Sequence, residues 1–101
     1  MWICTNKSFL SIVADRANKE NLLVRARISG HIENVFPDAK VFTMEDADYK
    51  YRAWVSRSEV QSAMTDQISA INYDNFKDSV SNQQLYDAYL KIWSVMYSLQ
   101  K

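Results

Sequence analysis

The sequence carries one cysteine and one histidine, residue types that often serve as nucleophile and general base. A Cys4–His31 pair could attack an acyl group if the histidine took the proton of the thiol. Neither residue has surroundings that favour this role, because Cys4 ends a short apolar start and His31 opens a short helical turn. We expect a thiol near the N-terminus, a helix-start histidine and no catalytic residue.

Other catalytic and ligand-binding motifs need residues that the sequence does not supply. Phosphate-binding loops need several glycines, and Gly30 is the only glycine. A zinc site needs several cysteine or histidine ligands at set spacings, and an EF-hand loop needs a central glycine. The twelve acidic residues show no spacing that singles out a pair for acid–base work. The sequence therefore predicts a non-enzymatic protein without a metal or a cofactor.

Two strands with basic residues are the most distinctive chemical feature. Segment 48–57 alternates with period two, the spacing of a strand with one buried and one open face. One side of this strand carries Tyr49, Tyr51, Ala53 and Val55, and the other carries Lys50, Arg52, Trp54 and Ser56. A second predicted strand, 22–28, has Leu22, Val24, Ala26 and Ile28 on one side, and Leu23, Arg25 and Arg27 on the other.

Pairing of these strands would gather a basic face around one aromatic ring. The predicted partner-binding residues are Arg25, Arg27, Lys50, Arg52 and Trp54. Cations beside a flat ring bind single-stranded nucleic acid, and arginine also suits the carboxylates of a protein partner. A third interpretation is internal pairing of the face with the acidic residues Glu33, Asp38, Glu45, Asp46 and Asp48. The sequence leaves these alternatives open.

The elements that must position this face follow from changes in periodicity. Strands are predicted at 9–14, 22–28, 40–44 and 48–57, a short helix at 30–36, and longer helices at 58–71 and from Ser81 or Asn82 to Gln100. We expect Ser58 to cap the first long helix, whose core stripe is Val60, Met64, Ile68 and Ile71. The order β-β-α-β-β-α-α predicts one α+β domain over residues 1–101, an antiparallel sheet of about four strands with helices on one face.

The final helix is apolar on nearly all sides. One stripe contains Leu85, Tyr89, Ile92, Met96 and Leu99, and a second contains Tyr86, Leu90, Trp93 and Tyr97. Such a helix must be buried, and we expect it to lie between the sheet and the 58–71 helix. If it is only partly covered, Tyr86, Trp93 and Tyr97 are candidates for an interface with a second copy or a host target.

Length and composition set wider limits. A chain of 101 residues with 48% apolar residues is long enough for one domain with a single core. Its formal net charge is zero, so electrostatic recognition must come from a local patch. The lone cysteine, the absence of a secretory signal, and the absence of an apolar run of ~18 residues predict a cytoplasmic protein that does not enter a membrane.

Six segments resemble a family of uncharacterised bacterial proteins of about this length: Ser8–Arg16, Leu22–Arg27, Phe36–Ala39, Asp48–Ala53, Tyr73–Lys77 and Ala88–Trp93. Such small proteins are often carried by phages and mobile elements, where inhibitors of host defence, including anti-CRISPR proteins, are frequent. The resemblance assigns no residue to an activity. It implies a protein that binds a host defence or nucleic-acid-handling complex. The alternative is direct binding of single-stranded DNA or RNA on the basic face.

Overall fold

The sheet in the computed structural model, which describes residues 1–101, has five antiparallel strands in the order β1-β2-β3-β5-β4. The strands are β1 Trp2–Cys4, β2 Phe9–Ala14, β3 Asn21–Ala26, β4 Phe42–Thr43 and β5 Tyr51–Ser56. The α+β prediction is confirmed, with one more strand than expected. The additional strand is β1, which is too short to show alternation but pairs with β2 through all three of its residues.

The helices occur along the chain in the predicted order, with the first between β3 and β4 and the others after β5. They are α1 His31–Val35, α2 Arg57–Ser69, the short 3₁₀ helix η1 Lys77–Ser79, and α3 Gln83–Tyr97. Asn82 caps α3 as predicted, because its side chain accepts a hydrogen bond from the Leu85 N–H. The prediction of Ser58 as the cap of α2 is wrong. Ser56 accepts from the Glu59 N–H, so the helix begins directly after β5. None of the helices combines the length and apolar character that crossing a membrane requires.

The main core lies between one face of the sheet and the helices α1 and α2. Its buried residues are Leu10, Ile12, Val24, Ala26, Ile32, Val35, Phe36, Ala53, Val55 and Val60. The strand residues among them are those that the period-two pattern assigns to one face. Alternation ends where β3 ends, so Ile28 is 47% exposed instead of buried with Val24 and Ala26.

Gly30 makes the sharp entry into α1 possible. Its φ of +91° lies in the left-handed region that residues with a Cβ avoid, and it stands at the N-terminal cap position of the helix. The turn brings Ile32 and Val35 over the sheet, where both are buried. The sequence-based placement of a short helix at 30–36 is thereby confirmed.

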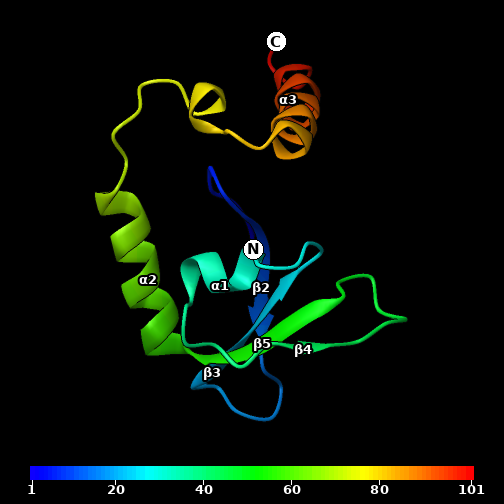
Figure 1. Ribbon diagram of the computed structural model, residues 1–101, viewed down its shortest axis with the longest axis vertical. Helices are drawn as coiled ribbons and strands as arrows, with labels where there is room; N and C mark the ends of the chain where they lie inside the picture. The colour runs from blue at the N-terminus through cyan, green and yellow to red at the C-terminus, as the bar shows by residue number, and fades with distance from the viewer.

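The position of α3 differs from the prediction. The helix does not lie between the sheet and α2: Figure 1 shows α3 and α2 well apart, joined by a long connection. Only Leu85 and Tyr89 of α3 are buried, and they form a small cluster with Val80, against which Phe9 and Phe76 pack. The expected stripe on α2 also stays partly open, because Ile68 is 69% exposed. Beyond Met64, α2 no longer packs against the sheet, so the two do not form a buried surface on which α3 could pack.

A candidate partner-binding face on the sheet

The face of the sheet opposite the main core carries a row of residues that runs across all five strands. Residues paired directly across antiparallel strands point to the same side. The register gives Trp2, Ser11, Arg25, Arg52 and Phe42 as one row, and Val13, Leu23 and Trp54 as the next. We call these eight residues the open face. The predicted pairing of the two basic strands is confirmed, since Arg25 lies opposite Arg52 and Leu23 opposite Trp54.

Three large rings of the open face are accessible to solvent. Trp2 is 74% exposed, Trp54 is 52% exposed and Phe42 is 37% exposed. No helix covers them, because α1 and α2 pack on the other side of the sheet and α3 packs against Phe9, at the start of β2. Exposed aromatic side chains beside arginines are the residue types that dominate binding energy at protein interfaces.

Trp2 and Phe42 were not found from the sequence. They lie on β1 and β4, strands of three and two residues, and no periodicity can be read over so few positions. The only available signal was residue type, a tryptophan and a phenylalanine in short apolar stretches. Their position in the same row as Arg25 and Arg52 depends on the strand register, which could not be predicted from the sequence.

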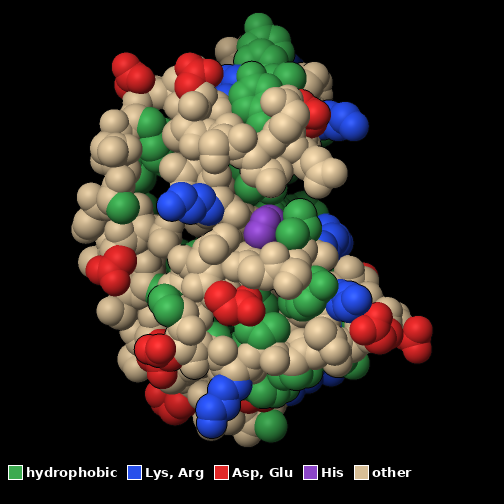
Figure 2. All heavy atoms as spheres, in the orientation of Figure 1, with side chains coloured by type: hydrophobic (Ala, Val, Ile, Leu, Met, Phe, Trp, Pro, Cys, Tyr) green, Lys and Arg blue, Asp and Glu red, His purple; other side chains and the backbone are tan.

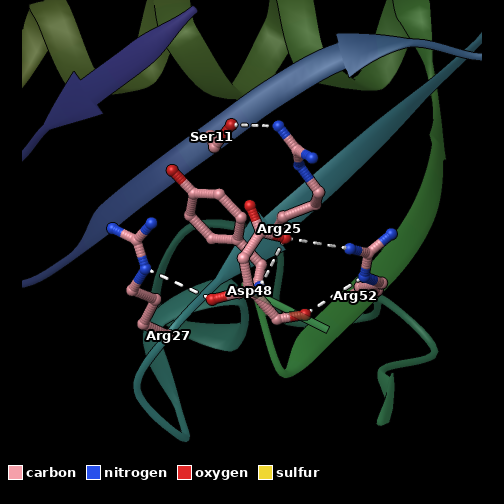
Figure 3. Close-up of polar contacts among 6 residues, drawn as sticks. Ser11, Arg25, Arg27, Asp48 and Arg52 are labelled. Carbon is pink, nitrogen blue, oxygen red and sulfur yellow. Dashed lines mark hydrogen bonds and ion pairs between the residues drawn. The ribbon is translucent and has the colours of Figure 1, made fainter. Parts of the chain in front are cut away.

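Arg25 lies in the middle of the row and makes contacts within the chain (Figure 3). Its Nη2 donates to Ser11 Oγ at 2.7 Å, and its Cζ lies 4.6 Å from the centre of the Tyr49 ring. Its Nε is buried without a hydrogen-bond partner. Ser11 is 1% exposed, so the arginine and its neighbours seal the polar side chain against the sheet. These contacts hold the Arg25 side chain against Ser11 and Tyr49, so it stabilises the open face.

Tyr49 lies on the arginine side, not on the core side predicted for it. Its ring is 3% exposed and is covered by Arg25 and by Arg27, whose Cζ lies 4.1 Å from the ring centre. Strand β5 begins only at Tyr51, and the preceding residues form a bend, so the period of two does not extend back to Tyr49. Arg27 itself is exposed and donates from Nε to the carbonyl oxygen of Asp48 at 3.3 Å (Figure 3).

The remaining cations pair with the acidic turn that precedes β5. Arg52 Nη2 lies 3.6 Å from Asp48 Oδ1, and Arg52 Nε donates to the Tyr49 carbonyl oxygen at 3.1 Å (Figure 3). Lys50 Nζ lies 3.3 Å from Glu45 Oε2. The other acidic residues considered as partners form no ion pair: Glu33, Asp38 and Asp46. Internal pairing thus takes up part of the basic charge and leaves the exposed rings free.

His31 and Cys4 have separate structural partners. The Phe9 N–H donates to His31 Nδ1 at 3.0 Å, and Ser8 Oγ donates to the His31 carbonyl oxygen at 2.8 Å. Cys4 lies beside Tyr89, whose hydroxyl donates to Ser8 O at 2.8 Å. Burial raises the pKa of Tyr89, which keeps this hydroxyl a donor. The histidine therefore connects α1 to β2 and does not bond the thiol.

The buried histidine makes the stability of the fold dependent on pH. Burial lowers the pKa of His31 below its ordinary value of 6.5. The bond from the Phe9 N–H also needs the neutral ring, because Nδ1 accepts it through its lone pair. The unfolded chain then binds a proton at a higher pH than the folded chain does. We expect the free energy of unfolding to fall as the pH drops from 6.5 through the lowered pKa.

Urea denaturation at a series of pH values between about 8 and about 5 measures how the free energy of unfolding depends on pH. His31→Gln should have the lower stability at neutral pH but a flatter pH profile over this range. An unchanged slope in His31→Gln would assign the pH dependence to other groups. Lys7→Gln, a change at an exposed position, is the matched control and should keep the native slope.

The aromatic candidates on α3 divide into two environments. Tyr86 is half-buried against the Val80–Leu85–Tyr89 cluster. Trp93 is 50% exposed and Tyr97 is 61% exposed, and their rings stack with centres 5.2 Å apart. In Figure 2, hydrophobic side chains gather at the surface of α3 at the top of the view. The rings of Trp93 and Tyr97 lie on α3 and not on the sheet, but Phe9 connects the α3 cluster to the open face, since its ring centre lies 6.3 Å from that of Trp2.

No group of three or more histidine, cysteine, aspartate or glutamate side chains is placed to hold a metal ion. The open face remains the surface where aromatic rings and arginines lie together. Comparisons of the chain with protein-family models, with curated proteins and with solved structures find no match.

Proposed function

We propose that the chain is a non-enzymatic binding protein whose open face docks on another protein. The observation that carries the proposal is the set of exposed rings, Trp2, Phe42 and Trp54, on an uncovered sheet that is braced by arginines. The rings supply apolar contact area, with Trp2 and Phe42 on the two edge strands and Trp54 in the neighbouring row. Arg52, which lies between Arg25 and Phe42 in the row, and Lys50 supply polar contacts next to the acidic turn.

The charge distribution favours a protein over nucleic acid as the partner. Phosphate binding needs several cations without carboxylate partners. Arg52 and Lys50 each have a carboxylate neighbour, and Arg25 is engaged with Ser11 and Tyr49. The chain as a whole has a formal net charge of zero. A mixed surface of rings, cations and carboxylates matches the composition of protein interfaces.

The expected partner is a host defence or nucleic-acid-handling complex, which the protein would inhibit by occupying a site on it. The resemblance to small bacterial proteins motivates this choice, and a sheet face with solvent-exposed rings suits the docking of a preformed domain. Single-stranded nucleic acid is the second candidate. It is favoured by Trp2 and Trp54, whose exposed rings offer stacking platforms beside Arg25 and Arg52.

Capture from bacterial lysate, with and without nuclease, tests the proposal. Native protein should retain a nuclease-resistant protein partner, and Trp2→Ala/Trp54→Ala should lose it, because hot-spot rings contribute ~2 kcal/mol or more each. Trp93→Ala is the matched control, since Trp93 is 50% exposed and Trp54 is 52% exposed but Trp93 lies on α3 and Trp54 on β5. This control variant should retain the partner.

Two results would contradict the proposal. Capture of nucleic acid alone, with an affinity that falls by about one power of salt concentration per phosphate contacted, would make nucleic acid the ligand. Retention of the same protein partner by Trp2→Ala/Trp54→Ala would remove the open face from the binding site.

A further inference from the structure

The C-terminal half of α3 and the residues after it form an apolar surface that the chain covers only in part, at Trp93, where Lys77 Nζ lies 5.2 Å from the ring centre. Segment 92–100 contains no charged residue. Its exposed apolar residues, with their exposed fractions, are Ile92 43%, Trp93 50%, Val95 64%, Met96 58%, Tyr97 61% and Leu99 66%. An isolated helix of about this length is marginally stable in water, so this half needs a packing surface.

This apolar surface wraps around more than half of the helix. At ~100° per residue, the polar residues Asp87, Lys91, Ser94 and Ser98 share one narrow strip. The apolar side chains of segment 92–99 spread over roughly 200° of the circumference. A flat partner or a single second helix would cover only part of such an arc. A concave apolar surface is needed to cover the whole of it.

The chain carries such a concave surface between α2 and the edge of the sheet. A groove of about 800 Å³ is lined by 13 residues, of which 9 are hydrophobic. Its apolar wall includes Ile3, Ile12, Leu22, Val60, Met64 and Ile68. Arg57 is the only charged side chain in the lining. We call this the α2 groove.

The helix of the same chain does not occupy the α2 groove. No residue of α3 belongs to its lining. Tyr89 anchors α3 at the turn between β1 and β2, where its hydroxyl donates to Thr5 O at 2.9 Å and to Ser8 O at 2.8 Å. One chain therefore has both an exposed apolar helix and an apolar groove that this helix does not contact. The hydrogen bonds of Tyr89 keep the helix away from the groove of its own chain.

We propose that segment 92–99 docks in the α2 groove of a second copy of the chain, and that the two copies exchange this contact reciprocally. The surfaces are complementary in shape, convex against concave. They are also complementary in chemistry, because an uncharged apolar helix meets a groove whose one charged side chain, Arg57, is exposed to solvent. The contact buries no carboxylate from segment 92–99.

The area involved is sufficient for a stable dimer. With about 200 Å² for a large side chain, the exposed fractions of segment 92–99 correspond to roughly 700 Å² per helix. A reciprocal exchange would bury two helices and two grooves, which exceeds the ~1,200 Å² at the lower end of stable interfaces. Val13 is the one open-face residue that lines the α2 groove, so the exposed rings Trp2, Phe42 and Trp54 stay available to the partner proposed above.

Sedimentation equilibrium between about 1 and 100 µM tests the proposal, and the native chain should form a dimer in this range. Met96→Asp places a carboxylate on the helix, and Ile68→Asp places one in the groove; each should weaken dimerisation by about tenfold or more. Both positions are exposed in the single chain, so the variants should fold, which circular dichroism checks. Ser94→Asp on the polar strip and Ser62→Asp on α2 outside the groove are matched controls that should dimerise like the native chain.

Mixing the two variants separates helix–groove exchange from other dimers. A Met96→Asp chain has an intact groove and an Ile68→Asp chain has an intact helix, so the mixture retains one of the two contacts. We expect the mixture to form more dimer than either variant alone. A native chain that stays monomeric to about 100 µM would overturn the proposal. So would a dimer that is weakened by Met96→Asp but not by Ile68→Asp, because the helices would then pack on each other.

Discussion

Replacing Tyr89 by alanine is expected to detach α3 from the sheet while the strands remain folded. The ring is 5% exposed and fills the small cluster with Val80 and Leu85, and its hydroxyl bonds the carbonyl oxygens of Thr5 and Ser8. Truncation of a buried aromatic residue costs ~3–5 kcal/mol. That cost should fall on α3, because the cluster is separate from the main core.

Native-state hydrogen exchange measures this local effect. In Tyr89→Ala the amides of 83–97 should exchange roughly a hundredfold faster, the factor that ~3 kcal/mol corresponds to. Amides of β2, β3 and β5 should keep their native protection. Leu10→Ala is the contrasting variant: Leu10 is fully buried in the main core, and its truncation should lower protection throughout the chain. Equal acceleration everywhere in Tyr89→Ala would show that α3 and the sheet unfold as one unit.

Arg25→Ala is expected to lower the stability of the sheet by about 2 kcal/mol. The variant loses the charged hydrogen bond to Ser11 and the contact with the Tyr49 ring, and it uncovers both side chains. Removal of the buried Nε, which has no partner, offsets part of this loss. For a domain of this size the melting temperature should fall by roughly 8–16 °C.

Thermal denaturation of Arg25→Ala and Arg27→Ala side by side measures this difference. Both arginines contact Tyr49, but Arg27 is exposed and bonds only a backbone carbonyl, so its loss should cost less than ~1 kcal/mol. A native melting temperature in Arg25→Ala combined with lost partner capture would instead make Arg25 a residue that contacts the partner.

Strand positions and faces could be predicted wherever alternation runs over a full strand. Val24, Ala26, Ala53 and Val55 lie in the core because successive strand residues point to opposite faces. The same rule failed at Tyr49, where it was extended beyond the start of β5 into a bend. The alternation of a strand identifies its two faces but not its exact ends.

Long-range placement could not be predicted. The apolar pattern of α3 shows that the helix must pack against other apolar residues, but it does not identify them. The prediction that α3 lies between the sheet and α2 was wrong. The side chain of Tyr89 settles the placement through carbonyl groups more than 80 positions away in the chain. Trp2 and Phe42 join the open face through the register alone, for the same reason.

Hydroxyl-radical footprinting of the chain, free and bound to its captured partner, tests the role of the open face most directly. Below about 1 µM, where the proposed dimer dissociates, the tryptophans serve as internal standards for one another, because Trp2, Trp54 and Trp93 are all at least half exposed in the single chain. Binding should slow the oxidation of Trp2 and Trp54 and leave Trp93 unchanged. Protection of Trp93, with Trp2 and Trp54 still oxidised at the rate of the free chain, would contradict the proposed site and place the partner on α3.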